Sequence, residues 1–165
     1  MMSPGWRKFA LAAHVVSSVG LLGSVAAFLA LALGGLWITD ERIVRGVYPA
    51  MDLIAQFVIV PLTFAALLTG IVQSVGTPWG LFRYYWVLAK LLLTAFAAAV
   101  LLMKMELIGY AARLSVETAF PRADLRVAGI ELAVHATGGL LVLLLPAILS
   151  VYKPPGITPW AARAA

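Results

Sequence analysis

The sequence predicts an all-α fold, a bundle of four transmembrane helices in up-down-up-down order. Three observations lead to this prediction. Hydrophobic residues make up 63% of the 165 residues and charged residues only 12%, against roughly 45–50% and 25% in soluble domains. Four stretches are long and apolar enough to cross a bilayer. Short polar segments separate these stretches, and short connections make successive helices antiparallel neighbours.

Each of the four stretches is long enough to form a membrane-spanning helix. A spanning helix needs about 20 mostly apolar residues, because lipid offers no partner for free backbone groups. The predicted spans are residues 9–36, 47–73, 82–108 and 127–152, within a single integral membrane domain over residues 1–165. The first is far longer than the roughly 7–15 apolar residues of a signal peptide, so we expect a retained helix. Pro61 and Pro146 are expected to kink their helices.

The charged residues indicate a membrane surface and an orientation. The net charge is +5, but the 12 Lys and Arg are scattered along the chain, which argues against binding to nucleic acid. The chain has no cysteine, which excludes disulfides and thiolate metal sites. With the N-terminus inside, Lys and Arg divide six against six, and all seven acids fall outside. We therefore expect a bacterial-type cytoplasmic membrane with both termini cytoplasmic.

Polar residues within the spans are costly in lipid and usually face the interior of a bundle. On the cytoplasmic side, His14, Ser17 and Ser18 share a face of the first helix, and Trp86 and Lys90 begin the third. These five residues form a candidate cofactor-binding layer. Two interpretations are open. His14 can be an axial haem ligand with Lys90 near a propionate, or His14 can hydrogen-bond to its neighbours while Lys90 extends toward the headgroups.

A second polar layer lies on the outer side. It comprises Asp52, Gln56, Lys104, Glu131 and His135. His14 and His135 are roughly 20 Å apart along the membrane normal at 1.5 Å per residue, so they cannot ligate one haem. The outer layer is interpreted as a salt-bridged network in which Lys104 neutralises Glu131 or Asp52. The alternative is a metal site.

Three methionines bear on that alternative. Met51, Met103 and Met105 lie near the outer layer, and thioethers favour Cu(I). Met103 and Met105 are two residues apart, however, and cannot both face the interior of a regular helix. The methionines therefore weaken the case for copper, and no metal is predicted.

Two motifs suggest relatives. Residues 13–20 (AHVVSSVG) and 85–93 (YWVLAKLLL) together resemble small bacterial four-helix membrane proteins of the copper-resistance-D-like and J-type protoporphyrinogen oxidase group. Nearly the whole chain resembles an uncharacterised branch of predicted integral membrane proteins, through residues 48–52, 76–83 and 149–154. The oxidase resemblance implies haem b at His14 and Lys90. The chain lacks the additional histidines that those enzymes carry near the far ends of helices one and three, which argues against oxidase activity.

Three functions remain open. The first is a non-catalytic membrane component that binds a partner protein, a lipid or a hydrophobic ligand, as a homo-oligomer or a subunit of a membrane complex, with no required cofactor. It predicts that the polar stripes pair with one another. The second is a redox protein with haem b at His14 and Lys90. The third is an ion or metal permease that uses Glu131 and His135. No catalytic constellation is evident in the sequence, and the first function is favoured.

Overall fold

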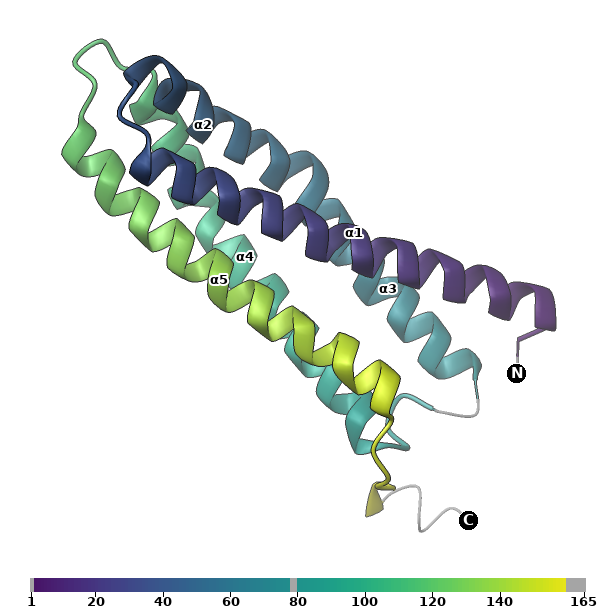
Figure 1. Cartoon of the computed structure of the whole chain (residues 1–165). Coiled ribbons are helices and arrows are strands. Elements are labelled where there is room, and N and C mark those ends of the chain that lie inside the picture. Colours follow the sequence, from purple (N-terminus) through teal and green to yellow (C-terminus); the bar gives the residue numbers. More distant parts are fainter. Residues whose placement is uncertain (1, 78–79, 160–165) are drawn as a thin grey trace.

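The computed structural model describes residues 2–77 and 80–159. Within these ranges all regular elements are helical. They are α1 (Pro4–Trp37), α2 (Glu41–Ile54), the π-helix η1 (Ala55–Ile59), α3 (Val60–Gly76), α4 (Tyr85–Ser115) and α5 (Arg122–Tyr152). Because α2, η1 and α3 follow one another without a break, the chain forms four long rods (Figure 1). The prediction of an all-α fold with four long apolar helices is confirmed.

Each rod is long and apolar enough to cross a membrane. The rods have 31 to 36 residues, and each contains an 18-residue stretch with a mean hydropathy of 2.1 to 2.2, whereas about 20 residues suffice to cross the hydrocarbon core. The predicted spans lie inside the rods except for residues 82–84, which precede α4. The rods are longer than the predicted spans because helical backbone hydrogen bonds also form between the polar residues at their ends.

Hydrogen bonds between rod ends define two ends of the bundle. The amide of Met2 donates to the carbonyl of Gly76 (3.3 Å), and the amide of Thr158 donates to that of Arg83 (2.9 Å). The beginning of α1 and the end of α5 therefore lie at one end, called the terminus end (Figure 1). At the opposite end, called the connection end, the Arg122 guanidinium donates to the carbonyls of Ile38 and Thr39 (3.3 and 3.2 Å).

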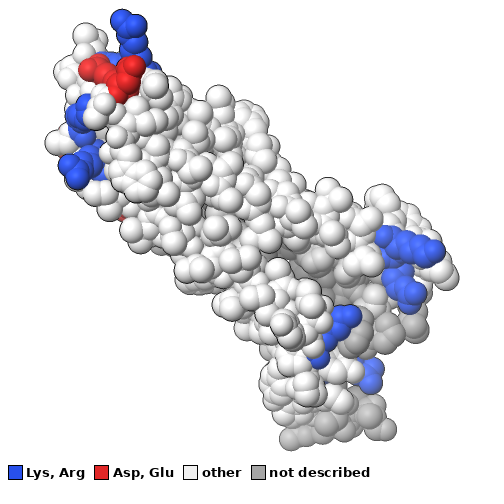
Figure 2. Space-filling view, in the orientation of Figure 1, with Lys and Arg blue, Asp and Glu red and all other residues white. Residues whose placement is uncertain are grey.

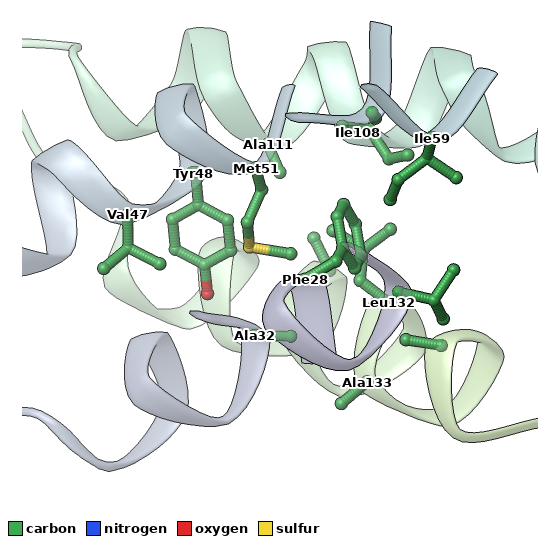
Figure 3. Packing of buried hydrophobic residues seen from close by; sticks show 14 of the residues in the cluster. Phe28, Ala32, Val47, Tyr48, Met51, Ile59, Ile108, Ala111, Leu132 and Ala133 are labelled. Atoms are coloured by element: carbon green, nitrogen blue, oxygen red, sulfur yellow. The ribbon is translucent and has the colours of Figure 1, made fainter. Parts of the chain in front are cut away.

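The packed core lies toward the connection end. α1 packs along α3 and α5, while α4 packs along α5 and along the rod formed by α2, η1 and α3. Figure 3 shows side chains from all four rods pointing into this core, among them Phe28, Met51, Ile108 and Leu132. Within α5, all of which is described, no residue after Ala136 is buried. The space-filling view correspondingly shows the molecule forking toward the terminus end (Figure 2).

Tyr48 holds three rods together at the connection end. Its side chain is only 1% exposed, and its hydroxyl donates to the carbonyl of Leu125 on α5 (3.1 Å). Glycines make room for the ring. A Cβ at Gly35 of α1 would lie 3.2 Å from the ring, and a Cβ at Gly129 of α5 would lie 2.5 Å from the hydroxyl oxygen. Tyr48 thus ties α2 to both α1 and α5.

Two prolines alter the second rod, and the structure accommodates each one differently. The π-helix η1 comes just before Pro61, where the amide of Val60 bonds to the carbonyl of Ala55. This wider turn separates the proline ring from the preceding turn. Pro49, inside α2, has no amide for the carbonyl of Arg45. The buried Ser115 of α4 donates its hydroxyl mainly to the carbonyl of Ala112 in its own helix (2.7 Å) and lies 3.4 Å from the Arg45 carbonyl, so it offers that carbonyl a weaker second contact.

The packing of Tyr48 predicts the response to Gly129→Ala. The added methyl group would overlap the Tyr48 hydroxyl, and overpacking of this kind costs roughly 1–3 kcal/mol of unfolding free energy. Gly138→Ala on the same helix is the matched control, because nothing lies within 4 Å of its added Cβ. Unfolding in mixed detergent micelles measures both variants. Equal stabilities of the two variants would contradict the described packing.

Candidate functional site

In the candidate cofactor-binding layer, His14 links α1 to α3. Its Nδ1 lies 3.1 Å from the carbonyl oxygen of Ala66 and 3.1 Å from Oγ1 of Thr69. The Thr69 hydroxyl donates its own proton to the carbonyl of Ala65 (2.6 Å). Nδ1 must therefore be the donor, and in the neutral ring Nε2 carries the free lone pair. The ring lies against Gly70, where an added Cβ would be 3.1 Å from Cε1.

Lys90 links α4 to α5. Its Nζ donates to Oγ of Ser150 (2.6 Å) and lies 5.5 Å from the centre of the Trp86 ring, in cation–π geometry. The Ser150 hydroxyl in turn donates to the carbonyl of Pro146 (2.8 Å). Trp86 is itself buried. The ammonium group is thus held by one hydroxyl and one aromatic face.

The predicted residues of this layer do not converge on one point. His14 binds to α3 and Lys90 to α5. Their helices, α1 and α4, are not among the pairs of described elements that pack along each other. The buried Ser17 donates to the carbonyl of Ala13 in its own helix (2.7 Å), and Ser18 is half-buried.

The outer layer divides into two separate groups. Lys104 of α4 and Glu131 of α5 form a salt bridge, with 2.7 Å between Nζ and Oε1. His135 uses Nδ1 to bond to the carbonyl of Glu131 in its own helix (2.7 Å). Gln56 donates to the carboxylate of Asp52 one turn earlier (2.8 Å). Of the two acids considered for Lys104, the structure pairs it with Glu131.

The methionines lie in different environments. Met51 is completely buried in the core, Met105 packs against the core, and Met103 is 77% exposed. Over residues 2–77 and 80–159, no group of three or more His, Cys, Asp or Glu side chains is placed to hold a metal ion. The arrangement therefore gives no support to a methionine-based copper site.

Sequence reasoning missed two arginines at the connection end that satisfy helix termini. The carbonyls in the last turn of a helix have no partner within it. At the end of α4, Arg45 donates to the carbonyls of Ser115 and Glu117 (3.2 and 2.6 Å) and stacks on Phe120, 4.6 Å from the ring centre. Just after α1, Arg122 donates to the carbonyls of Ile38 and Thr39. The sequence could have indicated this role, since both arginines lie within a few residues of a predicted span boundary, where helix ends need hydrogen-bond donors.

The partners Thr69 and Ser150 were also missed. Each is a hydroxyl residue inside an apolar span, and each donates to a carbonyl of its own helix while accepting from another helix.

Comparison with other proteins adds no further constraint. No family model matches the chain, and neither a curated protein nor a solved structure matches it significantly.

The salt bridge between α4 and α5 predicts a charge-exchange effect. Lys104→Glu or Glu131→Lys alone places two like charges together, so each should lower the unfolding midpoint by a few degrees. Exchanging both charges in one chain should recover most of the loss. Glu117→Gln is the control, because this carboxylate forms no ion pair in the described part of the chain. A double variant no more stable than the single variants would contradict the pairing.

Proposed function

We propose that this protein is a non-catalytic component of a membrane, which binds a partner protein, a lipid or a hydrophobic ligand. The pairing of its polar side chains carries the proposal. His14, Lys90, Lys104 and Glu131 each bond to a neighbouring helix. An active site needs groups with unused hydrogen-bonding capacity aimed at a substrate. Here the hydrogen bonds and the ion pair of these four side chains join helices, and large exposed apolar faces on all four rods provide the surface for a ligand or partner.

The proposed topology is up-down-up-down, with both termini in the cytoplasm of a bacterial-type cell. The bonds between rod ends support the alternation of direction. The charges support the orientation. Arg7, Lys8, Arg83 and Lys153 lie at the terminus end, whereas all seven acids lie from Asp40 to Asp52 and from Glu106 to Glu131. Figure 2 shows charged groups at the two ends of the visible face and none across its middle. A purely basic cytoplasmic face is typical of membrane proteins.

This orientation predicts a labelling pattern for single cysteines. The chain has no cysteine of its own, so each engineered thiol reports without background. A membrane-impermeant maleimide should label Thr118→Cys, between α4 and α5, in intact cells. It should label Ser3→Cys only after permeabilisation. The reversed pattern would place the termini outside, and labelling of both sites in intact cells would argue against insertion.

A second candidate function is binding of haem b at His14, and one observation favours it. Histidines that ligate metals usually donate their other ring N–H to a carbonyl, carboxylate or water. His14 makes this bond through Nδ1 to Ala66 and leaves Nε2 for an axial position. When bound, haem would supply one-electron redox chemistry.

An absorption spectrum distinguishes the two candidates. The proposed non-catalytic protein should be colourless when purified, and haemin should give no Soret band beyond that of a detergent blank. A Soret band that disappears in His14→Ala but persists in His135→Ala would establish the second candidate in its place. His135 is the matched control because it also uses Nδ1 on a helix carbonyl.

A further inference from the structure

We propose that the groove between α4 and α5 at the connection end binds the headgroup of a zwitterionic phospholipid that carries a primary ammonium. A surface pocket of about 320 Å³ lies there. Its lining includes Lys104 and Glu131, which form the salt bridge, together with Glu106, Tyr110 and Arg113 of α4. The inference rests on membrane insertion of the rods, which the cysteine labelling tests separately.

Two side chains of opposite charge line the pocket without a charged partner. In the part of the chain that the structure describes, neither Glu106 nor Arg113 forms an ion pair. Lys104 and Glu131, in contrast, neutralise each other. The pocket therefore presents one available carboxylate and one available guanidinium, which together suit a ligand that carries both a cation and an anion.

The positions of these two residues along α4 are compatible with the length of a phosphoethanolamine headgroup. Arg113 folds back along α4, so that its Nη1 would lie 3.3 Å from a Cβ at Gly109. The absence of a side chain at Gly109 makes this path possible. Glu106 lies three residues before Gly109, so its Cα is about 4.5 Å from that of Gly109 along the helix axis at 1.5 Å per residue. The four bonds between an ammonium nitrogen and its phosphorus, each about 1.5 Å, can span that separation.

The chemistry of the lining selects among headgroups. A guanidinium binds phosphate oxygens in bidentate fashion, and Tyr110, between the two charged residues in the sequence, lines the same pocket. A carboxylate accepts hydrogen bonds, and a primary ammonium has three to donate. A choline headgroup has no N–H donor, and a glycerol headgroup has no cation. The ammonium headgroup therefore satisfies both Glu106 and Arg113.

An apolar strip leads from the pocket toward the middle of the rods. Leu92, Phe96, Ala99 and Met103 follow the helical spacing that continues through Glu106, Tyr110 and Arg113, and all seven residues are exposed. Phe96 is 60% and Met103 77% exposed. No charged residue lies between Lys90 and Lys104, so the pocket marks the boundary at which headgroups lie. This strip favours a lipid with acyl chains over a soluble zwitterion.

The test is native mass spectrometry of the full chain in detergent with equal amounts of phosphatidylethanolamine, phosphatidylcholine and phosphatidylglycerol of one acyl composition. The wild-type protein should retain phosphatidylethanolamine preferentially. Glu106→Gln should reduce its retention to the level of phosphatidylcholine, and Arg113→Gln should weaken retention of all three lipids, each by about tenfold for loss of a charged hydrogen bond. Glu117→Gln and Arg126→Gln, which lie outside the pocket, should leave retention unchanged.

Several outcomes would overturn the inference. Equal retention of the three lipids, or a preference for phosphatidylglycerol, would exclude an ammonium headgroup. An effect of Arg113→Gln without one of Glu106→Gln would indicate a site for anions alone. Displacement of the lipid by millimolar phosphoethanolamine would exclude a site that depends on acyl chains. All four substitutions are on exposed positions, and an unchanged unfolding midpoint confirms that each variant folds. If labelling confirms insertion while retention is unselective, only this inference fails.

Discussion

In the proposed membrane setting, a polar side chain inside an apolar rod must find its hydrogen-bond partner on its own helix or on a neighbouring one, because hydrocarbon offers none. This constraint accounts for the side-chain arrangement. His14 forms its hydrogen bond with α3, and Lys90 forms its hydrogen bond with α5. Lys104 and Glu131 form a salt bridge between α4 and α5. The polar contacts thus join the rods in two pairs, α1 with α3 and α4 with α5. The two pairs are held to each other at the connection end, by the core around Tyr48 and by arginines at helix termini.

This division has a consequence for function. Since the core lies at the connection end and α5 buries no residue after Ala136, the two pairs of rods diverge toward the terminus end, where the basic residues lie. Polar groups in the spans serve the helix pairs, while the faces that remain exposed are apolar over the middle of the rods and charged at their ends. Such a surface suits lipids and other membrane helices, and the α4–α5 groove adds a place where charge and apolar surface meet.

Much of the fold could be predicted from the sequence, because the length of an apolar run and the position of polar breaks determine where membrane helices begin and end. Helical spacing also showed that His14, Lys90, Lys104 and Glu131 belong to polar stripes. It could not show which neighbour each stripe meets, since that depends on how the rods rotate and pair. The partners Thr69 and Ser150 emerge only once α1 is beside α3 and α4 beside α5. Likewise, Gly35 and Gly129 make room for Tyr48, whereas a Cβ added at Gly138 or Gly139 would meet no other part of the chain within 4 Å, and no spacing rule separates these two pairs of glycines.

The central claim is that polar side chains within the spans join helices, and it is tested most directly by a double-mutant cycle between Lys90 and Ser150. Lys90→Met, Ser150→Ala and the double variant would be compared by unfolding free energy in mixed micelles. The account predicts a favourable coupling of about 0.6 kcal/mol, and at most roughly 1.7 kcal/mol, as found for interhelical hydrogen bonds in membranes. Additive effects of the two substitutions, with no coupling, would contradict it.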